Sequence, residues 1–181
     1  LQERGRLTAA EQAIANALRV HPDHPDGLLT KADLLFERGQ CDDAVNWYQR
    51  VVAIEPQYAA AWLHLGHAWK RKGLLRKAVE AYRQAFRFGP DNPNAAYYLG
   101  ITLHALQDDA GAENALKRSL ALSPGNVSAR HLLNALTGKP VSQAPLEYIE
   151  ALFDRYAASF DFHMKGLLNY RIPAIMRKYL K

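Results

Sequence analysis

The sequence predicts an all-α fold, a solenoid of stacked helix-turn-helix units. The first observation is that prolines recur at equal intervals, at Pro22, Pro56, Pro90 and Pro124. The second is that small residues keep a fixed offset from these prolines, at Ala10, Ala44, Ala78 and Ala112. A period of about 34 residues is typical of helix pairs that cannot bury their own apolar faces and therefore stack on their neighbours.

The best-defined unit shows why two helices are expected in each period. Residues 59–71 carry large apolar side chains at helical spacing, with Gly66 as a small position where a neighbouring helix can approach closely. Gly73 then interrupts the pattern, and a second apolar stripe follows over residues 75–86. The adjacent Gly89 and Pro90 end the second helix.

The same register divides the chain into repeats and half-repeats. Complete units are expected at residues 25–58, 59–92 and 93–126. Residues 1–24 are expected to hold the second helix of a preceding unit, and residues 127–137 the first helix of a following one, which gives a solenoid domain over 1–137. Because the chain starts at Leu1 without Met, we expect the parent protein to have residues upstream.

The middle unit contains a pattern of residues that resembles the repeat motif of a known family. They read W-x2-L-G…A-x3-Y…P, as Trp62, Leu65, Gly66, Ala78, Tyr82 and Pro90. This pattern resembles the tetratricopeptide repeat over residues 1–137. The resemblance implies a protein-interaction scaffold that binds a protein or peptide in a concave groove lined by the first helix of each unit.

The repeat register assigns ten residues to that groove: Asp33, Phe36, His64, His67, Lys70, Arg71, Asn94, Tyr97, Tyr98 and His104. Aromatic rings beside basic and imidazole groups suit an extended peptide with acidic character. The subfamily that grips a C-terminal carboxylate has Lys and Asn at specific inner positions. This chain has Leu29 and Asp33, then Leu63 and His67, in comparable places, which argues against binding of chaperone tails.

Charge is unevenly distributed along the chain. Lys and Arg number 23 and Asp and Glu 18, a net charge of +5, and seven of the basic residues lie between Lys70 and Arg87. Arg76 and Lys77 stand where the neighbouring units have paired aspartates, although the helix dipole disfavours cations there by a few tenths of a kcal/mol each. The cluster indicates either an anionic partner or a solvated face balanced by Glu80. Nucleic acid is not expected, since no recognised binding motif accompanies the charge.

Composition gives no indication of catalysis or of a membrane. His64 and His67 lie one helical turn apart, but a metal site needs a third or fourth ligand, so no metal is expected. Neither a P-loop nor a dinucleotide-binding glycine motif occurs, and the chain itself is predicted not to be an enzyme. No apolar run approaches a membrane span. The single cysteine, Cys41, excludes an internal disulfide framework and favours a cytoplasmic location.

The repeats stop after residue 137. Residues 138–145 are expected to be a linker, and residues 146–181 a helical extension with one amphipathic face. Two stretches, Leu152–His163 and Leu168–Pro173, resemble the helical lead-in of class I S-adenosylmethionine-dependent methyltransferases, in particular bacterial proteins that join such a domain to tetratricopeptide repeats.

That resemblance implies a methyltransferase parent whose cofactor, S-adenosylmethionine, lies near Tyr156 or Phe160. The chain ends at Lys181 before any βαβ sheet, so no cofactor site is complete within it. The alternative is a stand-alone adaptor whose tail caps the array or dimerises. A homodimer formed through the exposed ends of the array is a further expectation.

Overall fold

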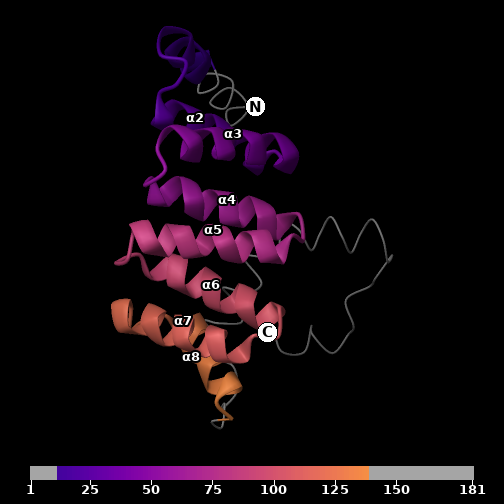
Figure 1. Cartoon of the computed structure of the whole chain (residues 1–181), viewed down its shortest axis with the longest axis vertical. Helices are drawn as coiled ribbons and strands as arrows, with labels where there is room; N and C mark the ends of the chain where they lie inside the picture. Colours follow the sequence, from indigo (N-terminus) through magenta and orange to yellow (C-terminus); the bar gives the residue numbers. More distant parts are fainter. Residues whose placement is uncertain (1–11, 139–181) are drawn as a thin grey trace, which may run out of the picture. The chain divides into compact units, whose positions relative to one another are not determined.

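The computed structural model describes residues 12–138 of the 181-residue chain, and the regular structure in this range is entirely α-helical, as the sequence predicts. Residues 12–20 are helical. The helices that follow are α2 (Pro25–Glu37), α3 (Cys41–Ile54), α4 (Ala59–Arg71), α5 (Leu75–Phe88), α6 (Pro93–Ala105), α7 (Asp109–Leu122) and α8 (Val127–Leu136). Figure 1 shows them stacked one after another in chain order.

The repeat period of the sequence reappears in the positions at which helices begin. The first helices of successive units begin at Pro25, Ala59, Pro93 and Val127, and the second helices at Cys41, Leu75 and Asp109. Two of the first helices have proline in the first turn, where its missing N–H group would have no helical partner. The local chemistry and the repeat register therefore agree.

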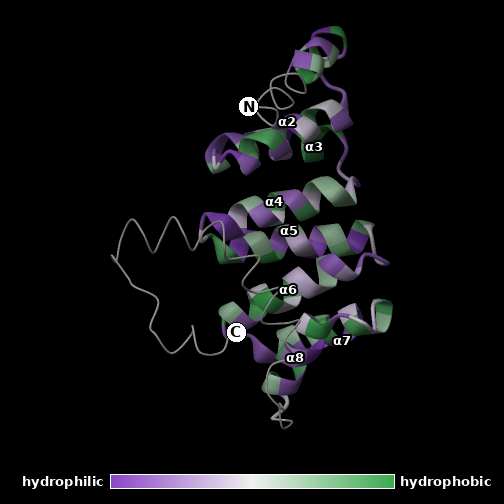
Figure 2. Cartoon of the chain, turned by 180° about the vertical axis from the view of Figure 1, so that it is seen from behind, coloured by the Kyte–Doolittle hydropathy of each residue, from purple (hydrophilic) through white to green (hydrophobic). Residues whose placement is uncertain are grey.

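Large side chains at equivalent positions form the core. Tyr48, Tyr82 and Leu116 occupy the same position in successive units and are almost completely buried. Each comes from the second helix of its unit and packs against the first helix. Figure 2 shows hydrophilic and hydrophobic residues mixed along the helices, as expected when each helix buries only part of its surface.

Glycine in the first helix makes room for these large side chains. A Cβ atom added at Gly66 would lie 2.5 Å from the Tyr82 ring, and one added at Gly100 would lie 2.8 Å from Leu116. Both distances are too short for any side chain. The small position recognised in the sequence therefore exists because the partner helix packs directly on the backbone.

The turn inside each unit requires a left-handed backbone conformation. Gly39 and Gly73 have φ angles of +79° and +76° at the end of the first helix. In the third unit the equivalent residue is Gln107, with φ +65°. A residue with a Cβ atom adopts this conformation at a cost, so the turn is set by the repeat geometry and not by glycine alone.

Several sequence predictions lie outside the described residues. They are the first part of the N-terminal half-unit, the linker after Gly138, and the helical extension at 146–181 with Tyr156 and Phe160. Among the helices of residues 12–138, none is both long enough and apolar enough to cross a lipid bilayer.

Candidate functional site: the first-helix face

One carboxylate joins three helices on the side of the array where the first helices α2, α4 and α6 contribute their polar side chains. We call this side the first-helix face. The hydroxyl of Tyr48 on α3 donates a hydrogen bond of 2.6 Å to Asp33 Oδ1 on α2. His64 Nδ1 on α4 lies 2.6 Å from the same oxygen. Since a carboxylate only accepts, this imidazole nitrogen carries a proton.

The next unit continues the face with rings packed on rings. His67 Nδ1 on α4 lies 2.8 Å from the Tyr82 hydroxyl on α5, which makes a second hydrogen bond between neighbouring helices. Tyr98 on α6 meets the His67 ring edge-on at a centroid distance of 4.3 Å. It also stacks on Tyr82 at 5.8 Å. Edge-on and stacked ring pairs of this kind contribute about 0.5–1.5 kcal/mol each beyond their buried area, so they favour these ring orientations.

The two buried tyrosine hydroxyls stay protonated well above neutral pH. Burial, the hydrogen bond to Asp33 and the charge of Asp33 together raise the pKa of Tyr48. Burial, followed by the neighbouring Tyr98, raises the pKa of Tyr82. Both residues therefore act as neutral hydrogen-bonding groups that hold the face together, and neither is a candidate base.

Cations cover aromatic rings at one end of α4. Lys70 Nζ lies 5.6 Å from the centre of the Tyr98 ring. The Arg71 guanidinium lies 5.0 Å from the Phe36 ring, and its Nη1 donates a hydrogen bond of 3.0 Å to the Phe36 carbonyl oxygen. Each cation–ring contact contributes about 0.5–1 kcal/mol at an exposed site. Arg71 is exposed, so positive charge is held at this edge of the face and is open to solvent.

The three remaining predicted groove residues all lie on α6, but their exposure and contacts differ. Asn94 is exposed in the first turn. His104 is exposed near the other end and bonds Asp109 at 2.7 Å. Tyr97 is only 8% exposed and packs with Leu116 and Ala129 in the core. Its assignment to the groove is therefore corrected, because adjacent helical residues point about 100° apart and Tyr98 takes the face position.

Sequence reasoning missed the contribution of the second helices. The sequence marks Tyr48 and Tyr82 as repeat positions, but their hydroxyls also reach Asp33 and His67 on the face. Their equivalent positions in successive repeats could have indicated this role, because equivalent positions direct both hydroxyls toward the same side of the array. Within residues 12–138, no group of three His, Cys, Asp or Glu side chains could hold a metal ion.

This chain matches short parts of curated relatives that are much longer proteins. The general transcriptional corepressor ssn6 of Schizosaccharomyces pombe is 31% identical over 117 residues, which covers 64% of this chain and 11% of the corepressor. The CTR9 homologue of Arabidopsis thaliana is 30% identical over 119 residues, or 65% of this chain and 11% of that protein. The chain thus spans about a tenth of the length of these relatives.

Solved structures share the fold at low sequence identity. MamA matches with a TM-score of 0.69 and 19% identity, over 88% of this chain and 94% of MamA. YrrB, described as a tetratricopeptide repeat protein with an unusual peptide-binding site, matches with 0.66 and 19%, over 86% and 75%. The first such domain of Spaghetti (RPAP3), bound to the HSP90 peptide SRMEEVD, matches with 0.61 and 22%, over 63% and 90%.

Two family models match the repeat region directly. One, described as TPR repeat, covers residues 32–73, and the other, described as tetratricopeptide repeat, covers residues 65–127. Together they span 96 of the 181 residues without a gap. With the helix pairs, the glycine contacts and the regular repeat period, these matches show that the chain is a tetratricopeptide repeat protein.

Proposed function

We propose that this chain is a non-catalytic binding module that holds an extended, acidic peptide segment of a partner protein on the first-helix face. The observation that carries the proposal is the arrangement of Tyr98, Lys70 and Arg71. Lys70 covers the Tyr98 ring and Arg71 covers the Phe36 ring. These two cation–ring pairs join α2, α4 and α6, the first helices of consecutive units.

The chemistry of the face favours such a ligand. Aromatic side chains contribute contact area at a low cost in conformational entropy, and the cations attract carboxylates before contact. Asp33 carries the opposite charge, but its oxygen already accepts two hydrogen bonds from Tyr48 and His64. Two solved structures of the same fold support a peptide ligand, since one holds an HSP90 peptide and the other is described by its peptide-binding site.

Binding of a chaperone tail by a carboxylate clamp remains disfavoured in this proposal. At positions where that subfamily has polar groups, Leu63 is buried in the core and Leu29 is partly buried against it. The acidic character of the ligand is therefore expected to come from its side chains, with no requirement for a free C-terminus.

The test is fluorescence anisotropy with labelled peptides chosen from an array of short acidic sequences. Tyr98→Ala and Arg71→Ala should each weaken binding by about fivefold or more, as expected for an aromatic anchor and a charged donor. Arg118→Ala, which removes an exposed cation on α7, is the matched control and should change binding by less than about twofold. Unchanged affinity in both face variants would refute the proposal.

We propose further that the parent protein carries a methyltransferase domain after this array. The support is the sequence pattern at Leu152–His163 and Leu168–Pro173, which lies outside the described residues and beyond both family-model matches. The coding sequence beyond Lys181 tests it. A strand followed by a glycine-rich turn would support the methyltransferase, and a stop codon would leave the adaptor alternative.

A further inference from the structure

A pocket of about 280 Å³ lies between α5 and the C-terminal end of α6, and we call it the α5–α6 pocket. None of its lining residues belongs to the first-helix face. Its volume is slightly below the range of about 300–1,000 Å³ typical of pockets for drug-sized ligands. The pocket therefore suits one or two side chains of a partner better than a complete small molecule.

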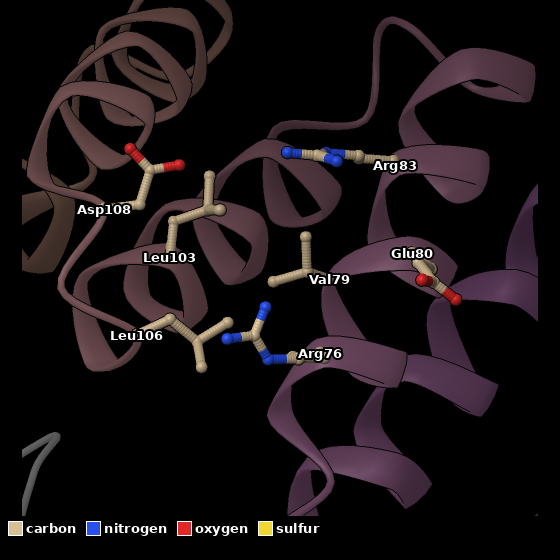
Figure 3. A pocket seen from close by; sticks show the side chains of 7 residues that line it. All are labelled: Arg76, Val79, Glu80, Arg83, Leu103, Leu106 and Asp108. Atoms are coloured by element: carbon tan, nitrogen blue, oxygen red, sulfur yellow. The ribbon is translucent and has the colours of Figure 1, made fainter.

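Two arginines on α5 extend across this pocket. Figure 3 shows Arg76 and Arg83 reaching toward the wall formed by Leu103, Leu106 and Asp108. Neither guanidinium has an ion pair or a hydrogen bond to another residue in the described part of the chain. Both side chains are exposed and can meet an incoming anion.

Among the described residues, the two carboxylates that line the pocket form no ion pair with these arginines. Asp108 is the N-cap of α7, and its Oδ1 accepts a hydrogen bond of 2.9 Å from the Gly111 N–H. Glu80 lies on α5 between the arginines, and Figure 3 shows that its carboxylate does not extend toward the leucines. Among the described residues, no ion pair joins Glu80 to Arg76 or Arg83.

The remaining wall is apolar. Val79 and Leu103 are 5% and 6% exposed and form its base, and Leu106 is partly buried beside them. A phosphate group alone would leave this apolar surface unused. A peptide in which an acidic residue adjoins a large aliphatic residue matches both parts of the pocket.

The position of Arg76 at the start of α5 adds an independent argument. The helix dipole favours acids in a first turn, and α3 and α7 have Asp42 and Asp109 there. The first turn of α5 has no acid, and Arg76 and Lys77 follow its first residue. Lys77 lies 4.6 Å from the Trp69 ring, which accounts for that cation within the fold. Within residues 12–138, no such contact accounts for Arg76.

We propose that the α5–α6 pocket is a second binding site, specific for a peptide segment in which an acidic residue adjoins an aliphatic one. A ligand carboxylate pairs with Arg76 or with Arg83, and the adjoining aliphatic side chain contacts Leu103 and Leu106. The array then holds two segments at once, one on the first-helix face and one in this pocket.

The test uses the full chain with the first-helix face disabled by Tyr98→Ala and Arg71→Ala. The probe is a fluorescein-labelled peptide of alternating glutamate and leucine. In this background, Arg76→Gln combined with Arg83→Gln should weaken binding about tenfold, as expected for lost charged hydrogen bonds. Arg87→Gln removes a charge from the same helix outside the pocket and should cost less than about twofold. Leu106→Ala should weaken binding about threefold through lost apolar contact.

Four results would overturn the proposal. The first is that the probe fails to bind the face-disabled chain. The second is that Arg87→Gln costs as much as the paired substitution, which would indicate general charge attraction. The third is equal binding of a probe with glutamine in place of glutamate. The fourth is that oligothymidine binds through the same two arginines while the peptide does not, which would make the pocket a phosphate site. Each result is independent of whether the first-helix face binds its own ligand.

Discussion

At the scale of single residues, the first-helix face depends on shared hydrogen bonds more than on isolated side chains. Asp33 is bonded by residues from two other helices, and His67 links α4 to α5 while contacting Tyr98. These polar groups are partly or fully removed from water. Leaving one without its partner costs more free energy than the bond itself contributes.

Replacing Asp33 tests that dependence. Asp33→Ala leaves the buried Tyr48 hydroxyl without its acceptor and should lower the free energy of unfolding by about 1–3 kcal/mol. Urea denaturation followed by circular dichroism measures it. The control is Asp42→Ala, which removes an exposed carboxylate that is paired with Lys72 in the first turn of α3 and should lower stability by no more than about 1 kcal/mol. Equal losses in the two variants would contradict the account.

High pH tests the buried tyrosines. Because the folded state raises the pKa of Tyr48 and Tyr82 above the ordinary value of about 10, folding favours their protonated forms. The resulting stability is complete below about pH 10 and is lost as the pH rises above it. Urea denaturation at pH 8 and pH 11 should show a smaller decrease for the Tyr48→Phe, Tyr82→Phe double variant than for the natural chain. The same decrease in both would exclude these hydroxyls as the cause.

At the scale of helices, each unit is a large side chain of the second helix packed on a small residue of the first. The Tyr82–Gly66 and Leu116–Gly100 contacts are equivalent and set how closely the two helices approach. Capping is less regular. Asn92, Asp108 and Asn126 accept hydrogen bonds at the N-termini of α6, α7 and α8, whereas α2 to α5 have no side-chain cap. Packing therefore defines the earlier helices more than capping does.

The glycine contact predicts a clear asymmetry between two substitutions. Gly66→Ala places a methyl group against the buried Tyr82 ring and should destabilise the chain by about 1–3 kcal/mol, despite the gain of up to about 1 kcal/mol in helix propensity. Gly125→Ala meets no atom within 4 Å and should stay within about 0.5 kcal/mol of the natural chain. Thermal melts of both variants provide the comparison, and a stabilised Gly66→Ala protein would refute the packing argument.

At the scale of the whole array, stability is a sum over neighbouring helices. α4 and α5 have a neighbour on both sides and contribute many buried residues, whereas Ala129 is the buried residue of α8. In such an array the ends open before the middle. The first-helix face and the α5–α6 pocket both include residues of these central helices. Both sites therefore lie in the part of the array that we expect to be most stable.

Hydrogen exchange measures this gradient. Amides of α4 and α5 should exchange slowest among residues 12–138, and those of residues 12–20 and α8 fastest. The reason is burial, because α4 and α5 contain many buried residues, α8 contains only Ala129 and residues 12–20 contain none. Mass spectrometry of peptic fragments resolves these segments. Uniform protection along the array would mean that it opens in a single cooperative step.

The sequence predicted the helices well and the site only in part. The repeat period determines where helices begin, since glycine, proline and apolar spacing all act locally. It does not determine that His64 bonds Asp33, 31 positions earlier, because that contact depends on how neighbouring units pack. Tyr97 shows the same limit, since the direction of a side chain between groove and core depends on the rotation of α6 in the stack.

The central claim is that the first-helix face binds an acidic peptide, and residue-resolved NMR titration tests it most directly. An acidic peptide that binds in the anisotropy screen would be added to the isotope-labelled chain. The account predicts the largest shifts at Phe36, Lys70, Arg71 and Tyr98, and loss of these shifts in Tyr98→Ala. Shifts confined to the second helices, or none at saturating peptide, would contradict it.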